Sequence, residues 1–98
     1  MATALIGARR SAAEIIHEIL TLCAKGGINK TAIMYKSNLS YDQLRRYLTA
    51  LCDDDYISKN DSGAFETTAT GRKALKGMAG AVKTLKELRI EFGGRPTG

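Results

Sequence analysis

Residues 30–51 read KTAIMYKSNLSYDQLRRYLTAL, and this stretch decides the fold. It holds two helical segments, and each is preceded by a residue type that caps helices well. Asn29 stands before the first segment, and Ser40 opens the second, which is predicted to span residues 40–52. Only residues 37–39 separate the two segments. Two helices joined by so short a turn form a helix-turn-helix.

The helix predicted for residues 40–52 has two chemically different faces. At about 100° per residue, Leu44, Leu48 and Leu51 fall on one side, which is expected to be buried. The side chains expected to be exposed are Tyr41, Asp42, Gln43, Arg45, Arg46 and Thr49. From this helix alone, a contact with nucleic acid and a merely soluble surface are equally good interpretations.

An amphipathic helix is also predicted before this stretch. Ser11 and Glu14 have the spacing of a capping box, and Gly26-Gly27 ends the helix after residues 11–25. Ile28 is then an isolated apolar residue, enough for one rung of a strand.

After the helix-turn-helix the periodicity changes. Residues 56–68 contain two β-prone runs around the turn sequence NDSG, so they predict a hairpin. Thr70 is predicted to cap a long last helix that extends to residue 92. The fold class is therefore mainly α with a small β-hairpin (α+β), in the element order of a winged helix-turn-helix with a long C-terminal helix. The predicted divisions are a flexible N-terminal arm (1–8), the winged helix-turn-helix domain (9–76), a C-terminal dimerisation helix (77–92) and a flexible tail (93–98).

Three segments also resemble a known family. They are RRSAAEIIHEIL in the first helix, KTAIMYKSNLSYDQLRRYLTAL in the centre, and TATGRKAL at the start of the last helix. Together they cover about residues 9–76, and they resemble the archaeal winged-helix family of small dimeric chromatin-associated DNA-binding proteins and related transcriptional regulators. The resemblance implies that the third helix enters the major groove. It also implies that the last helix pairs with its counterpart in a second subunit as an antiparallel coiled coil.

The candidate DNA-binding residues follow from their chemistry and position. Arginine donates two bonds to guanine, glutamine pairs with adenine, and tyrosine, threonine and lysine reach phosphate. Asp42 would repel phosphate unless it accepts a bond from cytosine or holds Arg45 or Arg46. Arg9 and Arg10 either form a flexible arm or have no role in binding. The candidates are Lys30, Lys36, Ser40, Tyr41, Gln43, Arg45, Arg46, Thr49, Lys59 and Asn60.

The last helix carries an apolar stripe at heptad-like spacing. Its first members are expected to pack on the domain, whereas the part from Val82 onward is expected to be exposed and to imply a homodimer. Gly77 and Gly80 mark either a kink or a close helix crossing. A G-x-x-G loop that clamps RNA is a further interpretation, but the fold that surrounds such loops is not predicted here. The predicted dimerisation residues are Met78, Val82, Leu85, Leu88 and Phe92.

Composition favours an anionic partner. The 15 Lys and Arg residues exceed the 10 Asp and Glu residues, which gives a net charge of +5. The acidic residues are concentrated in residues 53–71, between two basic segments. No apolar run is long enough for a membrane span or a signal peptide, so a cytoplasmic, nucleoid-associated protein that contacts no membrane is expected.

Cofactor and catalytic chemistry are not expected. Cys23 and Cys52 are widely spaced and His17 is the one histidine, so the sequence indicates two buried free thiols and no zinc site. The acidic run at 53–55 lacks a second ligand cluster and is interpreted as a solvated helix end. The sequence shows no nucleophile paired with a general base, so an enzyme is not expected, and no metal or cofactor is predicted.

Two functions remain open from the sequence. The first is a homodimeric protein that binds double-stranded DNA, as a transcriptional regulator or a nucleoid component. The second is a winged-helix module for protein–protein interaction that uses the acidic hairpin or the last helix.

Overall fold

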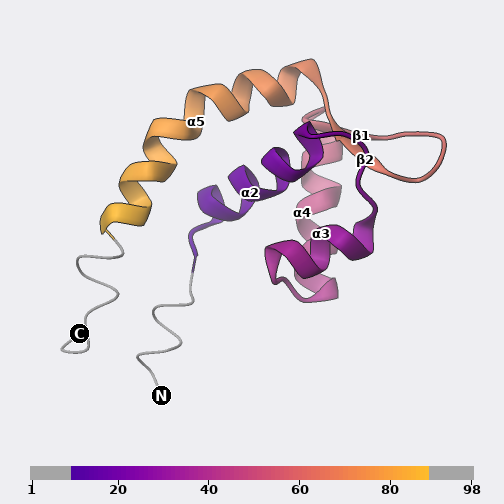
Figure 1. Cartoon of the computed structure of the whole chain (residues 1–98), viewed down its shortest axis with the longest axis horizontal. Helices are drawn as coiled ribbons and strands as arrows, with labels where there is room; N and C mark the ends of the chain where they lie inside the picture. The colour runs from indigo at the N-terminus through magenta and orange to yellow at the C-terminus, as the bar shows by residue number, and fades with distance from the viewer. Residues whose placement is uncertain (1–9, 89–98) are drawn as a thin grey trace.

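The helices and strands follow the predicted order. The computed structural model describes residues 10–88 of the chain. Its elements are α2 (Ala12–Ala24), α3 (Lys30–Ser37), α4 (Tyr41–Asp53), β1 (Ile57–Lys59), β2 (Phe65–Thr67) and α5 (Ala69–Leu88). Helix α2 lies between α5 on one side and α3 on the other, and the hairpin projects at the opposite end of the molecule from the C-terminal end of α5 (Figure 1). This mostly helical arrangement with one hairpin confirms the winged helix fold class.

The predicted caps of the three N-terminal helices are present. Ser11 and Ser40 each accept a bond from the backbone N–H three residues ahead, at 3.1 Å in both cases. The side chains of Glu14 and Gln43 return a bond to the backbone N–H of the capping serine, which completes two capping boxes. Asn29 caps α3 by accepting from the backbone N–H of the third helical residue at 2.8 Å. These local bonds fix where each helix of the helix-turn-helix begins.

The predicted cap of the last helix is wrong by two residues. Helix α5 begins at Ala69, and the backbone N–H of Gly71 donates to Thr68 Oγ1 at 3.0 Å. Thr68, and not Thr70, therefore occupies the capping position. The reason is tertiary, because the Thr68 backbone N–H also donates to the Tyr56 carbonyl at 3.0 Å and so ties the start of α5 to the hairpin.

The core is one cluster of apolar side chains from every element before α5. The predicted inner face of α4 is confirmed, since Leu44, Leu48 and Leu51 are all buried. Burying one such side chain contributes about 1.5–3 kcal/mol relative to leaving it exposed. The cluster consists of Ile15, Ile19, Leu20, Cys23, Ile33, Leu39, Leu44, Leu48, Leu51, Ile57 and Phe65.

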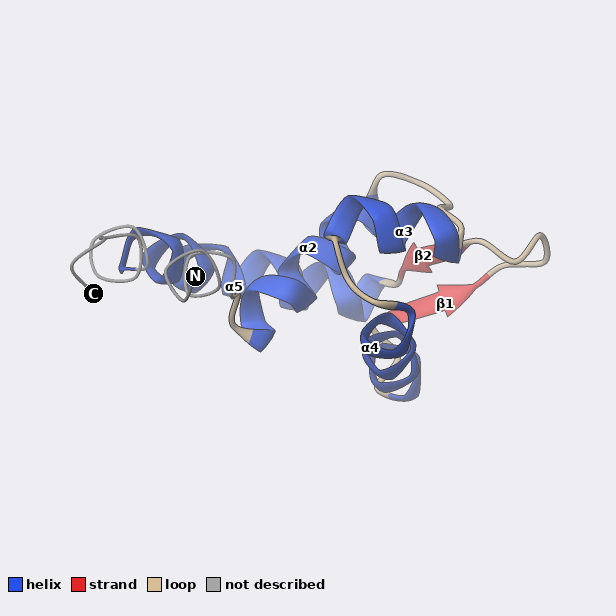
Figure 2. Cartoon of the chain, turned by 90° about the horizontal axis from the view of Figure 1, so that it is seen from below, coloured by secondary structure: helices blue, strands red, loops and turns tan. Residues whose placement is uncertain are grey.

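The hairpin is held to the helices by backbone and side-chain bonds. Strands β1 and β2 are antiparallel, and Ile28 adds the predicted single rung by exchanging backbone bonds with Phe65 at 3.1 and 2.8 Å. The Thr67 hydroxyl donates to the Leu20 carbonyl of α2 at 2.8 Å in a buried position. Figure 2 shows α4 beside β1 and apart from α5, so the helix-turn-helix and the hairpin share one side of the molecule.

The apolar stripe of α5 faces the chain's own body further than predicted. Leu75 and Met78 pack against the core cluster, and Val82 is only 2% exposed. The expectation that the stripe is exposed from Val82 onward is therefore wrong at that residue. Heptad spacing predicts that a stripe is covered, but it does not say whether the cover is the same chain or a second one. The side chains of Leu85 and Leu88, and all of Phe92, lie outside the described part of the chain.

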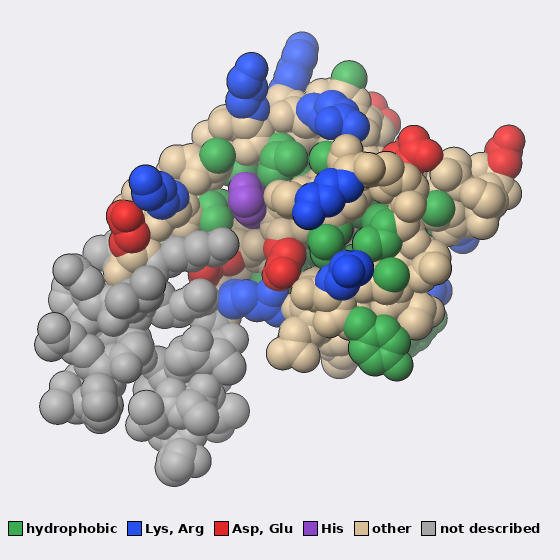
Figure 3. Space-filling model, in the orientation of Figure 1, with side chains coloured by type: hydrophobic (Ala, Val, Ile, Leu, Met, Phe, Trp, Pro, Cys, Tyr) green, Lys and Arg blue, Asp and Glu red, His purple; other side chains and the backbone are tan. Residues whose placement is uncertain are grey.

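The outward face of α5 is cationic. Figure 3 shows Lys and Arg side chains along the margin where Figure 1 places α5. No large apolar side chain is exposed on the described part of this helix. The exposed basic residues are Arg72, Lys73, Lys76 and Lys83.

Candidate nucleic-acid interface

The outer face of α4 is exposed as predicted. The side chains of Arg45 and Arg46 are 61% and 76% exposed, and Tyr41 is 54% exposed. The remaining predicted members of this face are exposed too: Asp42, Gln43 and Thr49. Because the leucines of the opposite face are buried, the helix presents these side chains to solvent on a fixed backbone.

Asp42 bonds both arginines. Its Oδ1 accepts from Arg45 Nη2 at 3.3 Å and its Oδ2 accepts from Arg46 Nη2 at 3.1 Å. The hydrogen bond from Arg45, together with the positive charge of Arg46 and its hydrogen bond, lowers the pKa of Asp42 below its ordinary value of 3.8. Of the roles considered for Asp42, holding the arginines is therefore the one that this geometry shows.

Lys30 and Tyr41 join the N-terminal ends of α3 and α4. The Lys30 ammonium lies 5.1 Å from the centroid of the Tyr41 ring, which is within cation–π range. Lys30 is the first residue of α3, where free backbone N–H groups and the helix dipole favour an anion. A lysine, a tyrosine and a helix N-terminus therefore converge at the edge of the α4 face.

A hollow brings predicted residues of three elements together. Its volume is about 340 Å³, and it is lined by Lys30 from α3, Arg45 and Thr49 from α4, and Lys59 from β1. Asp53 and Cys52 line it as well. Three cationic side chains against one carboxylate make this concave strip suited to an anionic backbone.

The comparisons with known proteins agree with this geometry. The sequence model of the winged helix-turn-helix family matches residues 9–87. The chain belongs to the winged helix-turn-helix family. It is 38% identical over 70 residues to the uncharacterized protein MJ0287 of Methanocaldococcus jannaschii, and the match covers 71% of each chain. It is also 35% identical over 68 residues to the uncharacterized protein MJ0290 of the same organism, covering 69% of this chain and 32% of that relative.

In this winged helix-turn-helix protein, two predicted contact residues already have partners. Gln43 Oε1 accepts from the Ser40 backbone N–H at 3.1 Å as part of the α4 capping box. Pairing with adenine in the bidentate manner uses both the oxygen and the nitrogen of the amide, so Gln43 can read adenine in that way only if this bond opens. The Ser40 oxygen accepts from the Gln43 N–H at 3.1 Å, which leaves its hydroxyl hydrogen as a donor.

The two predicted wing residues lie in different surroundings. Lys59 lines the hollow and lies 5.8 Å from the centroid of the Phe65 ring. Asn60 instead organises the turn of the hairpin: its Oδ1 accepts from Ser62 and Ala64, and its Nδ2 donates to Glu66 at 2.9 Å. Both ends of the Asn60 amide therefore have partners within the hairpin, and its contact with DNA stays a prediction.

Helix α3 carries two exposed residues near its C-terminal end, Lys36, which was predicted to contact DNA, and Tyr35, which was not. Lys36 is exposed near the C-terminal end of α3, away from the hollow that Lys30 lines. Tyr35 beside it is 75% exposed. A signal for Tyr35 was available, because a residue two positions after the buried Ile33 lies about 200° around the helix and therefore outward.

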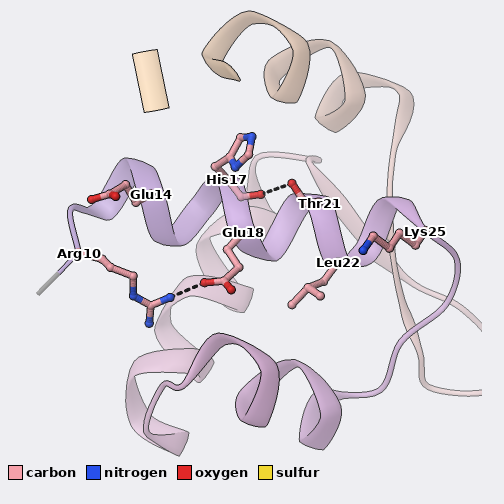
Figure 4. A pocket seen from close by; sticks show the side chains of 7 residues that line it. All are labelled: Arg10, Glu14, His17, Glu18, Thr21, Leu22 and Lys25. Atoms are coloured by element: carbon pink, nitrogen blue, oxygen red, sulfur yellow. Dashed lines mark hydrogen bonds and ion pairs between the residues drawn. The ribbon is translucent and has the colours of Figure 1, made fainter. Parts of the chain in front are cut away.

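Arg10 has a structural role that neither interpretation of it anticipated. It forms an ion pair with Glu18 of α2 and donates to the carbonyl of Ser37 at the end of α3. Arg10 and Glu18 line a second hollow, of about 440 Å³, along α2 (Figure 4). His17 points from α2 toward α5, whereas Glu18 points toward α3. Arg10 therefore links two helices, and Arg9 lies outside the described residues.

The two cysteine thiols are free, and burial affects both of them. Within residues 10–88, no group of three or more His, Cys, Asp and Glu side chains could hold a metal ion. Cys23 is free and buried, and Cys52 is free and half-buried. Burial, followed by the nearby Cys52, raises the pKa of the Cys23 thiol to about 11, and burial also raises the pKa of Cys52. Both shifts keep the thiols protonated and weakly nucleophilic.

One further finding concerns membranes. None of the helices described between residues 10 and 88 is both long enough and apolar enough to cross a bilayer.

Proposed function

We propose that this winged helix-turn-helix protein binds double-stranded DNA by placing α4 in the major groove. The observation that carries the proposal is the exposed face of α4, where Arg45 and Arg46 stand opposite the buried leucines. Arginine is the side chain best suited to the acceptors of guanine, and the groove of B-form DNA is wide enough to admit a helix.

The surroundings of α4 support phosphate contacts on its flank. The N-terminus of α3 with Lys30, and the wing residue Lys59, line the hollow beside α4. Such contacts fix the orientation of a protein on the duplex without reading its sequence. Tyr41 and Thr49 add hydroxyl groups that can donate to phosphate oxygens.

A salt titration tests the proposal. If about six phosphates are neutralised, the logarithm of the affinity falls with the logarithm of salt concentration with a slope near −5, which is roughly a thousandfold loss between 50 and 200 mM salt. A mobility-shift titration with a random duplex at these two salt concentrations measures this. Replacing Arg45 and Arg46 by alanine should weaken binding strongly without unfolding the protein.

A matched control removes the same charge elsewhere. Lys73 and Lys76 are also exposed but lie on α5, so replacing both by alanine lowers the net charge equally without touching the α4 face. Equal losses in the two double variants would mean that general attraction and not α4 binds the duplex. Binding that hardly responds to salt would contradict the proposal outright.

The cellular role follows from the sequence preference. A transcriptional regulator should prefer the promoter region of its own gene to a random duplex, whereas a nucleoid component should bind both equally. Running both duplexes as competing probes separates these roles. Either role places the protein in the cytoplasm, in contact with the nucleoid.

We extend the proposal to a homodimer formed through the end of α5. Because Met78 and Val82 face the chain's own body, the dimer contact must rest on the later apolar positions of the stripe. These are Leu85, Leu88 and Phe92. Sedimentation equilibrium should give twice the mass of one chain, and replacing Leu85 and Leu88 by serine should give the mass of one.

The acidic segment of residues 53–66, which includes the hairpin turn, supports the second candidate function, a protein-interaction module. The acidic side chains between residues 53 and 66 are all exposed: Asp53, Asp54, Asp55, Asp61 and Glu66. Such a surface fits a basic partner better than DNA. If replacing Arg45 and Arg46 by glutamate left cellular activity intact, this second function would be favoured over DNA binding.

A further inference from the structure

One carboxylate holds both of the arginines that face outward from α4. Each oxygen of Asp42 accepts a bond from a different guanidinium, at 3.3 Å from Arg45 and 3.1 Å from Arg46. Within residues 10–88, neither arginine forms an ion pair with any other side chain. The three side chains are more than half exposed, so solvent or a ligand can reach them directly.

The carboxylate changes what the arginines offer to an anion. Two free guanidinium groups would carry a charge of +2, whereas the three side chains together carry +1. The pKa of Asp42 is lowered, chiefly by its hydrogen bond from Arg45, so this negative charge is present at neutral pH. The centre of the proposed binding face is thus half neutralised in the free protein.

Phosphate and base edges respond differently to this arrangement. A phosphate competes with Asp42 for the guanidinium groups, and it brings its own negative charge close to the carboxylate. A guanine edge presents neutral acceptors to an arginine, and the amino group of cytosine can donate to a carboxylate. Asp42 therefore disfavours contact with the phosphate backbone of DNA more than it disfavours contact with a guanine or cytosine edge.

We propose that Asp42 is a specificity-determining residue that competes with DNA phosphate for Arg45 and Arg46. In the free protein it holds both arginines, and contact with a matching base edge releases them. The loss of Asp42 should then increase the affinity for DNA in general while reducing the preference among sequences. This inference rests on the proposed function, and it concerns how the same face selects its target.

The test compares two isosteric substitutions that remove one negative charge. Asp42→Asn keeps the size of the side chain but removes the charge that holds the arginines. Asp55→Asn makes the same change beyond the end of α4, at a residue with φ 64°, a left-handed conformation that asparagine tolerates well. Circular dichroism should show the same helix content in both variants and the wild type.

The first readout is affinity for a random duplex as a function of salt. Asp42→Asn should bind about three- to tenfold more tightly than the wild type, because two exposed ion pairs no longer compete with DNA for the arginines. The slope of the logarithm of affinity against the logarithm of salt concentration should also be steeper by about one per chain. Asp55→Asn should change both quantities much less. Equal tightening by the two variants would show an effect of net charge alone and would overturn the inference.

The second readout is sequence preference. Sequencing the bound fraction of a randomised duplex pool should show a narrower range of enrichment for Asp42→Asn than for the wild type. Unchanged or weaker binding of Asp42→Asn to random duplex would overturn the inference, because Asp42 would then support binding. A wild type that does not bind duplex even at low salt would refute the proposed function, and the inference with it.

Discussion

Gly71 is the position where a single added methyl group should be most damaging. A Cβ placed there would lie 2.1 Å from the Tyr56 carbonyl oxygen and 2.6 Å from Thr67 Cγ2, so the carbonyl would have to retreat by roughly 1 Å. That carbonyl accepts the Thr68 N–H bond at the start of α5. Overpacking of this kind costs about 1–3 kcal/mol and a weakened hydrogen bond about 1 kcal/mol more. Gly71→Ala should therefore lower the free energy of unfolding by about 3 kcal/mol.

The same substitution later in the same helix provides the control. A Cβ at Gly77 would meet nothing within 4 Å, so Gly77→Ala should gain about 1 kcal/mol from helix propensity alone. Thermal unfolding followed by circular dichroism should show a Tm lower by on the order of 15 °C for Gly71→Ala and higher by about 4–8 °C for Gly77→Ala. A Gly71→Ala variant as stable as the wild type would refute the packing of α5 on the hairpin.

Three further predictions concern stability. Folding raises the pKa of Cys23 from 9.0 to about 11, so the folded state holds this proton more tightly than the unfolded state. The free energy of unfolding should therefore fall by about 2 kcal/mol as the pH rises across that interval. Urea titrations under reducing conditions should show that the free energy of unfolding of Cys23→Ala depends less on pH. Ser40→Ala removes the cap of α4 and should cost about 1 kcal/mol in urea unfolding; no change would contradict the capping box. Arg10→Met removes the bonds to Glu18 and Ser37 and should cost about 2 kcal/mol, and a neutral effect would mean that this link between α2 and α3 contributes nothing.

Much of the fold could be predicted because its signals are local. The capping boxes at Ser11 and Ser40 involve residues three positions apart, and the spacing of Leu44, Leu48 and Leu51 marks a buried face without knowledge of what covers it. A residue's place on a helix face depends only on the helical repeat. The exposed α4 face was predictable for the same reason.

The errors came from contacts between residues that are distant in sequence. Thr68 replaces Thr70 as a cap because Tyr56, on the far side of the hairpin, bonds its backbone. Arg10 reaches Ser37, which lies 27 positions later, and no local pattern marks that pair. Val82 lies on the predicted stripe, but its cover belongs to its own chain. In each case, the partner is set by tertiary packing.

An NMR titration tests the central claim most directly. A short duplex is added to ¹⁵N-labelled protein, and the backbone amide shifts are followed residue by residue. The account predicts that the largest changes fall on α4 between residues 41 and 49, on Lys30 and on Lys59, with little change along α5. Changes confined to the acidic residues 53–66 or to α5, with α4 unaffected, would contradict it.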